Sequence, residues 1–368
     1  MHTSVVRAAE QLPPETAWAT SPVRIFADDL TGACDAAAPF VRTARAVRVW
    51  LGSVAGLFAS EPVQAFHTAS RNLAPEDAAL AVTEAASQLP SAARTLVYKK
   101  VDSTLRGPIA AELLALQQTL HASAILLAPA FPAAGRVVRG GVLEVRTRGG
   151  QPEARALSEI FPAEMHSQIA LVPDADRLAS AFASGKSLLL CDSVTQPELD
   201  AVARAGQSLA GLLFAGSAGL ATALAHLDSQ SVPTSSLPRA SRVLLIAGSR
   251  HPVTALQLER MSAVPESFHP QARLLRIEPA AGAGRQVCDA FTQQQPEAVF
   301  FTGGDTAQFA ATALGAHSIL LRGQFAPGVP WGIAQGGVLH GRIVITKSGG
   351  FGPPDLLCDL LKALGRPA

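Results

Sequence analysis

The chain has 368 residues, of which 48% are hydrophobic, 5% aromatic and 16% charged, and its formal net charge is +1. This length fits two domains of roughly 100–200 residues each, and Ala, Val and Leu must fill their cores. The near-neutral net charge argues against a nucleic-acid or membrane-surface partner. The four cysteines form no CxxC pair, which argues against a disulfide scaffold or structural zinc site.

The start of the chain carries no apolar stretch typical of a signal peptide, so we expect a frayed extension at 1–21 and a cytoplasmic protein. Short apolar strands then alternate with polar or Gly-rich turns and Ala/Leu-rich helices. The strands are predicted at 23–27, 46–52, 63–68, 95–101, 124–130, 187–192, 211–215, 243–248, 298–302 and 342–346. This alternation predicts an α/β fold with mostly parallel sheets.

A stretch rich in Ser and Pro, "DSQSVPTSSLPRAS", is the best linker candidate. We therefore place one domain at 22–228, a linker at 229–240 and a second domain at 241–368. We expect each domain to hold its own mostly parallel sheet flanked by helices, with the active site in the cleft between the domains. The Gly-rich segment at 140–150 is expected to form a hairpin or a mobile loop.

Two motifs are near misses of known catalytic sequences. "SAFASGKS" has Ser180 in place of the first glycine of a P-loop and precedes a strand, so a glycine at a helix C-terminus is the better interpretation. "AGSAG" has Ala215 in place of the first glycine of a nucleophile elbow. An esterase using Ser217 is therefore a weaker alternative to close helix–strand packing.

Polar clusters follow three predicted strands of the first domain. Asp28 and Asp29 follow the first strand, "HTASRN" at 67–72 supplies Arg71, and "KKVDSTLRG" at 99–107 supplies Lys100 and Arg106. Ligands of open α/β sheets bind at the carboxyl ends of the strands. Carboxylates, hydroxyls and cations together suit a small, anionic, hydroxylated ligand, since Arg and Lys hold a carboxylate and Asp can accept a hydroxyl proton.

Each of these residues has a structural alternative. Asp29 can cap the helix that follows, whereas Asp28 is harder to explain as a cap. Lys99 and Lys100 point to opposite faces of a strand, so we expect at most one of them to face the site and the other to be a solvated charge. Arg106 can equally be a surface ion-pair partner.

Three Gly-rich loops precede helices in the second domain, at 247–252, 302–306 and 347–352. Small residues let backbone N–H groups approach an anion, and a helix N-terminus adds a favourable dipole. Three such loops predict a phosphate or nucleotide site. Together the two domains suit phosphoryl transfer across an interdomain cleft.

These clusters, in this order, resemble the four-carbon acid sugar kinases, which have a sugar-binding N-terminal domain and a nucleotide-binding C-terminal domain. The matching stretches are "ADDLTGACD", "HTASRNLAPEDA", "KKVDSTLRGPIAAEL", "APAFPAAGR", "GSAGLATAL", "AGSRHPVTALQLE", "TGGDTAQ" and "TKSGGFGPPDLL". They span nearly the whole chain, from Ala27 to Leu357.

The resemblance implies ATP-dependent phosphorylation of the terminal 4-hydroxyl of threonate, erythronate or a 3-oxo-tetronate, with Asp28 as candidate general base. It implies substrate-binding roles for Asp28, Asp29, Ser70, Arg71, Lys100, Asp102, Ser103 and Arg106. It implies ATP-binding roles for Ser249, Gly303, Gly304, Asp305, Thr306 and Gly349.

Mg²⁺ is expected with ATP, because the charge of a transferring phosphoryl group must be offset, but no residue stands out as its ligand. The expected partners are a sugar acid and ATP, without nucleic acid or membrane, and a homodimer is an open option. After Arg136 the sequence "VVRGGVLEV" departs from the family pattern. The choice of acid therefore stays open, and a non-catalytic sensor of sugar acid and nucleotide is the alternative.

Overall fold

The computed structural model describes residues 21–43, 45–52, 60–89, 95–146, 153–228, 232–263, 271–278, 280 and 282–365. Residues 1–20 of the expected extension, 229–231 of the expected linker and 147–150 of the expected hairpin or loop lie outside these ranges. The domain limits therefore remain predictions. Within the described ranges, no helix is long and apolar enough to cross a membrane.

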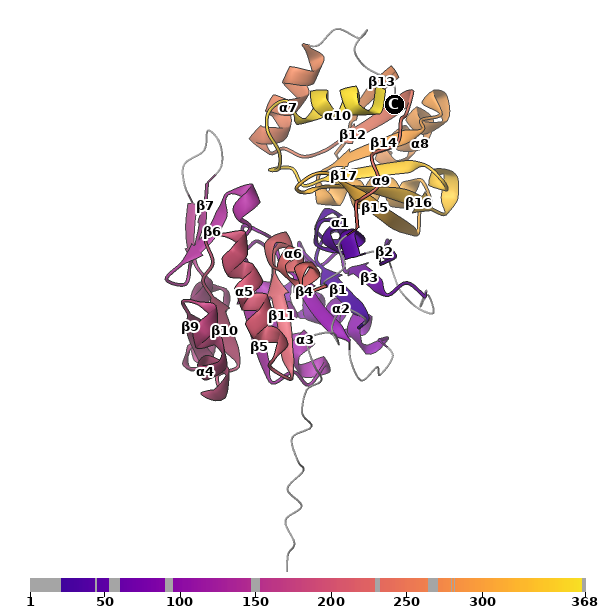
Figure 1. Cartoon of the computed structure of the whole chain (residues 1–368). Coiled ribbons are helices and arrows are strands. Elements are labelled where there is room, and N and C mark those ends of the chain that lie inside the picture. The colour runs from indigo at the N-terminus through magenta and orange to yellow at the C-terminus, as the bar shows by residue number, and fades with distance from the viewer. Residues whose placement is uncertain are drawn as a thin grey trace, which may run out of the picture.

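The N-terminal lobe, residues 21–228, is the indigo-to-rose part of Figure 1. Its strands in the main sheet are β1 (Val23–Ala27), β2 (Val47–Trp50), β3 (Val63–His67), β4 (Leu96–Lys100), β5 (Ala124–Ala128), β9 (Ile169–Val172), β10 (Leu188–Cys191) and β11 (Leu212–Gly216). Its α-helices are α1 (Leu30–Ala37), α2 (Pro75–Ser87), α3 (Ile109–Thr119), α4 (Leu178–Ala183), α5 (Gln196–Gln207) and α6 (Ala218–His226). A small antiparallel sheet contains β6 (Arg136–Arg139), β7 (Val142–Val145) and β8 (Glu153–Ala156).

The C-terminal lobe, residues 232–365, is the orange-to-yellow part of Figure 1. Its strands are β12 (Arg242–Ala247), β13 (Gln271–Arg276), β14 (Ala298–Thr302), β15 (Ser318–Ala326), β16 (Val329–Gln335) and β17 (Ile343–Lys347). Its α-helices are α7 (Pro252–Ser262), α8 (Ala283–Gln294), α9 (Gly304–Ala313) and α10 (Leu356–Gly365). Short 3-10 helices in the two lobes are η2 (Ala38–Thr43), η3 (Pro132–Ala134), η4 (Leu157–Ile160), η5 (Ala163–Gln168), η6 (Ala175–Arg177) and η8 (Gly337–Leu339).

The α/β class is confirmed, but the expectation of a separate sheet in each domain is not. Both lobes contribute to one 14-stranded mixed sheet of order β13-β12-β14-β17-β16-β15-β2-β3-β1-β4-β11-β5-β10-β9. The junction is the antiparallel pairing of β15 with β2, in which Ser318 lies opposite Trp50 and Leu321 opposite Val47. Because each strand supplies the other with hydrogen-bonding partners, neither lobe leaves an exposed edge there.

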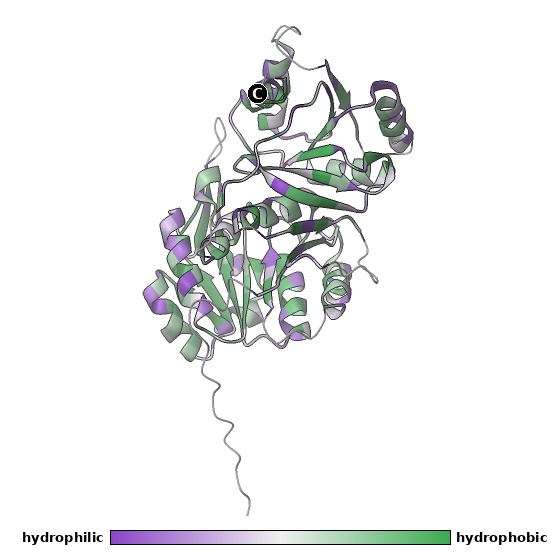
Figure 2. Cartoon of the chain, turned by 45° about the vertical axis from the view of Figure 1, so that its right-hand side comes forward, coloured by the Kyte–Doolittle hydropathy of each residue, from purple (hydrophilic) through white to green (hydrophobic). Residues whose placement is uncertain are grey.

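The central parallel strands of the N-terminal lobe are buried on both faces. Every residue of β1, β3 and β5 is buried, which explains why their sequences are mostly apolar. Figure 2 shows the hydrophobic colour concentrated on the strands and the hydrophilic colour on the outer helix faces. Helix α1 is buried along its whole length, because it packs against β3, α6 and α9. Its N-terminus therefore lies between the lobes.

Two local predictions are confirmed in the described residues. Helix α4 ends at Ala183, and Gly185 follows with a φ of +76° before β10 begins, as expected for a helix terminus and not for a P-loop. Strands β6 and β7 form a hairpin around Gly140 and Gly141, which confirms the hairpin over the part of 140–150 that is described.

Candidate active site

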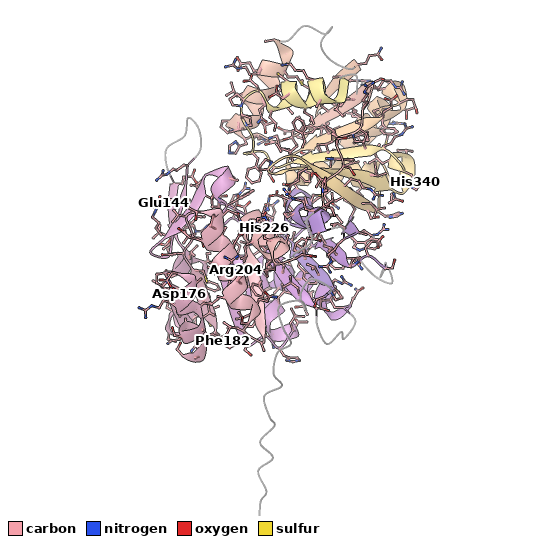
Figure 3. All side chains as sticks on the ribbon, viewed as in Figure 1. Glu144, Asp176, Phe182, Arg204, His226 and His340 are labelled. Carbon is pink, nitrogen blue, oxygen red and sulfur yellow. The ribbon has the colours of Figure 1, made fainter. Side chains whose placement is uncertain are left out.

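A cleft of about 700 Å³ is lined by residues of both lobes. The N-terminal lobe contributes side chains that follow β1, β3 and β4, and the C-terminal lobe contributes the loops that follow β12, β14 and β17. The small sheet adds a further wall with Arg136, Val145 and Glu153, while its Glu144 lies on the outer side of the lobe (Figure 3). The polar clusters predicted from the sequence thus converge, because the carboxyl ends of parallel strands share an edge.

Arg71 joins the two aspartates that end β1. Its Nε and Nη2 donate to Oδ2 and Oδ1 of Asp28 at 2.7 and 2.9 Å, and its Nη1 donates to Oδ2 of Asp29 at 2.6 Å. Asp29 lines the cleft, and both Asp28 and Asp29 line a neighbouring, more apolar cavity of about 480 Å³. Both carboxylates therefore form ion pairs with Arg71.

Asp29 also caps α1, which confirms the capping interpretation. Its Oδ1 accepts a hydrogen bond from the backbone N–H of Gly32 at 2.7 Å. Burial alone would raise the pKa of this carboxyl, but the charges of Arg71 and Lys100 outweigh burial and hold the pKa below its ordinary value. Asp29 is thus a fixed negative charge at the cleft.

The two lysines of β4 face opposite sides, as predicted, but the expectation that one is solvated is wrong. Lys99 is fully buried, and its Nζ lies 3.1 Å from Oε2 of Glu112 on α3. The other Glu112 oxygen, Oε1, accepts from the Ser70 hydroxyl at 2.5 Å. Strand β4 is central in the sheet, so both of its faces are covered and the charge must be paired. Lys100 lines the cleft, whereas Ser70 does not.

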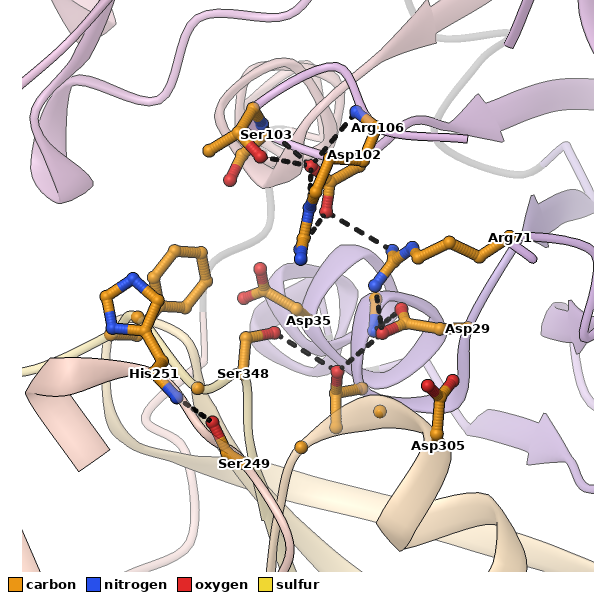
Figure 4. A pocket seen from close by; sticks show the side chains of 18 of the residues that line it. Asp29, Asp35, Arg71, Asp102, Ser103, Arg106, Ser249, His251, Asp305 and Ser348 are labelled. Atoms are coloured by element: carbon orange, nitrogen blue, oxygen red, sulfur yellow. Dashed lines mark hydrogen bonds and ion pairs between the residues drawn. The ribbon is translucent and has the colours of Figure 1, made fainter. Parts of the chain in front are cut away.

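The loop after β4 is organised by Asp102, as Figure 4 shows. Oδ1 of Asp102 accepts from the Thr104 hydroxyl at 2.5 Å, and Oδ2 accepts from Nη2 of Arg106 at 2.8 Å. Burial would raise the pKa of Asp102, but the hydrogen bond from Arg106 and the charge of Arg71 hold it well below its usual range. Arg106 is thus an ion-pair partner whose side chain, 67% exposed, also lines the cleft beside Ser103.

The C-terminal lobe presents Ser249, Gly303, Gly304, Thr306 and Gly349 to the cleft, together with the exposed Asp305. Gly303 has a φ of +100°, which favours glycine. A Cβ on Gly304 would overlap the Asp29 carboxylate, so the first turn of α9 can approach Asp29 only because this residue is glycine.

Among the described residues, two hydrogen bonds between side chains join the lobes across the cleft. The Asn72 amide donates to Oδ2 of Asp305 at 3.3 Å, and the hydroxyls of Thr31 and Ser348 lie 3.1 Å apart. The latter contact is drawn in Figure 4. The residues that the resemblance assigned to ATP thus line the cleft from the C-terminal lobe, opposite the side chains that follow β1, β3 and β4.

Sequence reasoning missed Lys347, the last residue of β17. Its side chain is fully buried, and its Nζ donates to the carbonyls of Ser348 and Gly349 at 3.0 Å each and to the hydroxyl of Thr254 at 3.3 Å. Burial lowers the pKa of this amine to about 7. Lys347 fixes the backbone of the Gly-rich loop, and a lysine ending an otherwise apolar strand was the available signal.

Arg136 and Phe351 were missed as well. The Arg136 guanidinium lies 5.2 Å from the centroid of the Phe351 ring, and Phe131 meets the same ring edge-on at 5.7 Å. These contacts tie the last Gly-rich loop to the small sheet.

Asp35, the only acid within α1, also lines the cleft and was missed, although a lone carboxylate in an apolar helix was visible in the sequence.

Ser217, the nucleophile of the esterase alternative, serves the fold. It is fully buried, its hydroxyl donates to the Ala130 carbonyl at 2.7 Å, and its Oγ accepts from the N–H of Gly219 at 3.2 Å as the cap of α6. The structure therefore favours the packing interpretation over the esterase.

No group of three or more His, Cys, Asp and Glu side chains that could hold a metal ion occurs among the described residues. The chain thus offers no Mg²⁺ cage of its own there. Mg²⁺ commonly binds through one or two carboxylates together with substrate phosphates.

A cleft that sets cations and carboxylates opposite Gly-rich helix N-termini is typical of enzymes that bring a small polar substrate to a nucleotide. The family "Sugar-binding N-terminal domain" matches residues 23–169, and "Nucleotide-binding C-terminal domain" matches residues 277–357. The chain belongs to the four-carbon acid sugar kinase family.

Curated relatives match over nearly their whole length. The D-threonate kinase of Bordetella bronchiseptica is 30% identical over 93% of this chain and 97% of its own. The D-erythronate kinase of Heliobacterium modesticaldum is 25% identical over 94% and 97%. A crystal structure of a Haemophilus influenzae protein has a TM-score of 0.66 at 21% identity, covering 93% of this chain and 98% of that one, which supports the fold.

Proposed function

We propose that the chain transfers the γ-phosphoryl group of ATP to the terminal 4-hydroxyl of a four-carbon sugar acid of the threonate, erythronate or 3-oxo-tetronate type. One cleft is lined by residues suited to each of the two reactants, and this observation supports the proposal most directly. Arg71 and Lys100 stand on one side, and Ser249, Gly303 and Gly349 stand on the other.

The N-terminal side suits the sugar acid. Lys100, Arg71 and Arg106 supply positive charge for a carboxylate, and Ser103 supplies a hydroxyl. Asp29 and Asp102 keep their charges and can accept hydrogen bonds from sugar hydroxyls. The same groups favour an acid over the corresponding neutral sugar, since only the acid brings a carboxylate that their positive charges can hold.

The C-terminal side suits the nucleotide. Helices α7 and α9 both begin at the cleft, where their dipoles favour phosphate oxygens, and the first turn of α9 has no side-chain cap to compete for its N–H groups. Positioning and charge stabilisation account for most of the catalysis of phosphoryl transfer. Mg²⁺ is proposed only as the companion of the ATP phosphates, where it would offset their charge.

Asp28 was the predicted general base, and its contacts favour another role. Both of its oxygens accept from Arg71, and it does not line the cleft. We propose that Asp28 holds Arg71 in the orientation that receives the substrate carboxylate.

We propose that the protein is cytoplasmic and forms a homodimer. All four cysteines are free, which suits a reducing compartment.

A screen of ADP release with a panel of four- and five-carbon sugar acids tests the proposed function. We expect ATP consumption that depends on a four-carbon acid and is absent with the corresponding neutral sugar. ATP binding without turnover on any acid would instead support the sensor alternative.

A further inference from the structure

Asp35 is buried in the cleft with an oxygen that lacks a partner. The residue is 2% exposed and lines the cleft. Its Oδ1 accepts no hydrogen bond from any residue that the structure describes. Figure 4 shows its carboxylate projecting from α1 into the space between Asp102 and Ser348, with no dashed line reaching it. An unpaired buried oxygen is costly in a stable fold, and a catalytic role is one of the reasons for which proteins keep one.

The other carboxylates of the cleft are engaged or exposed. Asp29 caps α1 and binds Arg71, while both oxygens of Asp102 accept hydrogen bonds. The exposed acids at its rim are Glu153, Glu278 and Asp305. Asp35 thus combines burial with a free acceptor.

Charges on several elements face Asp35. Burial raises its pKa from 3.8 to about 7, which Lys100 on β4 and Arg136 on β6 oppose and Asp29 at the start of α1 reinforces. Tyr98 on β4 and Cys34 on α1 are also close enough to sense its charge, and burial raises the pKa of both. A carboxylate tuned to neutral pH accepts a proton more effectively than one at its ordinary pKa.

We propose that Asp35 is the general base of the phosphoryl transfer, a role that rests on the proposed function. As the hydroxyl oxygen of the sugar acid bonds to the γ-phosphorus of ATP, Oδ1 of Asp35 takes the hydroxyl proton. The bond from the γ-phosphorus to the β,γ-bridging oxygen breaks, and its electron pair leaves with ADP. The neutral Asp35 then releases the proton to solvent, which completes the balance of sugar acid and ATP to phosphorylated acid, ADP and a proton.

The test compares the full-length wild type with Asp35→Asn, Asp35→Glu and Asp28→Asn in turnover from pH 5.5 to 9. We expect wild-type kcat to rise with pH and level off above the pKa of Asp35. Asp35→Asn should lower kcat by about 10²–10⁴-fold and abolish the rising limb, with ATP binding kept within about threefold in calorimetry. Asp28→Asn should raise KM for the sugar acid and leave the rise of kcat with pH unchanged.

Three results would overturn the proposal. The first is an Asp35→Asn enzyme that keeps kcat within tenfold together with the rising limb. The second is the loss of the limb in Asp28→Asn instead. The third is recovery of Asp35→Asn turnover at raised Mg²⁺, which would make Asp35 a metal ligand.

Two controls keep the outcomes distinct. If Asp35→Asn does not fold, Asp35→Glu carries the test, because a carboxylate moved by one methylene must shift the rising limb, and an unmoved limb contradicts the role. Wild-type turnover is measured first. A folded wild type that binds ATP but phosphorylates no acid overturns the proposed function itself.

Discussion

The guanidinium of Arg71 donates hydrogen bonds to both carboxylate oxygens of Asp28, at 2.7 Å from Nε and 2.9 Å from Nη2. This pair explains why two adjacent acids follow β1. Asp28 fixes Arg71 from one side, while Asp29 caps α1 and takes the remaining guanidinium nitrogen. Burial would lower the pKa of Arg71, but the charges of Asp29 and Asp28 outweigh it and raise the pKa above its ordinary value.

The two-pronged contact predicts that Arg71→Lys is not conservative. An ammonium cannot reproduce the planar fork that spans Asp28 and Asp29. We expect KM for the sugar acid to rise at least about tenfold, with a smaller fall in kcat. Steady-state kinetics with Arg204→Lys, a change at an exposed site on α5 (Figure 3), provides the control. An unchanged KM for the acid would remove Arg71 from the binding site.

The close approach of α9 to Asp29 predicts that Gly304→Ala is harmful. The new Cβ would collide with the Asp29 carboxylate, so α9 must move away from the cleft. We expect KM for ATP to rise and the protein to lose stability, although Gly→Ala in a helix usually stabilises by up to about 1 kcal/mol. Gly284→Ala in the first turn of α8 is the matched control, since its Cβ would meet atoms only at 3.8 Å. Equal behaviour of the two variants would argue against the lobe contact.

Lys347→Met should damage nucleotide binding. Without the ammonium, the carbonyls of Ser348 and Gly349 lose a donor, and the loop that carries Gly349 loses its fixed shape. We expect the Kd for ATP, measured by calorimetry, to rise about tenfold, while Lys362→Met on α10 leaves it unchanged. ATP binding at wild-type strength in Lys347→Met would show that the loop does not need this lysine.

Asp35 should make stability depend on pH. Because its folded pKa is raised from 3.8 to about 7, the stability it contributes is present below pH 4 and is lost as pH rises through 7. Asp35→Asn should therefore be more stable than the wild type at pH 8, by roughly 2–4 kcal/mol, and the gap should close towards pH 4. Urea unfolding at both pH values measures this difference. A gap that stays constant with pH would contradict the raised pKa.

Local elements could be predicted from the sequence because their signals are local. The apolar segment "VRIFA" is β1 with the predicted bounds, and the three strand–loop–helix units of the second half appear as β12–α7, β14–α9 and β17–α10. Asp29 as a cap and the opposite faces of Lys99 and Lys100 followed from geometry that a few neighbouring residues determine.

What depends on distant pairing could not be predicted. The β15–β16 hairpin joins both lobes into one sheet because β15 pairs with β2, which lies about 270 residues earlier in the chain. The burial of Lys99 required α3 to supply Glu112. Likewise, the environment of Asp35 is set by Lys100 and Arg136, which come from separate strands. The sequence therefore indicated which segments meet at the cleft, but not which carboxylate would be left free there.

The most direct measurement of the central claim is NMR of the reaction product formed from ATP and a four-carbon sugar acid. Phosphoryl transfer to the terminal hydroxyl predicts one phosphate per ADP released, with phosphorus coupling to the C4 protons of the acid. A product phosphorylated at another carbon, or ADP released with only inorganic phosphate, would contradict it.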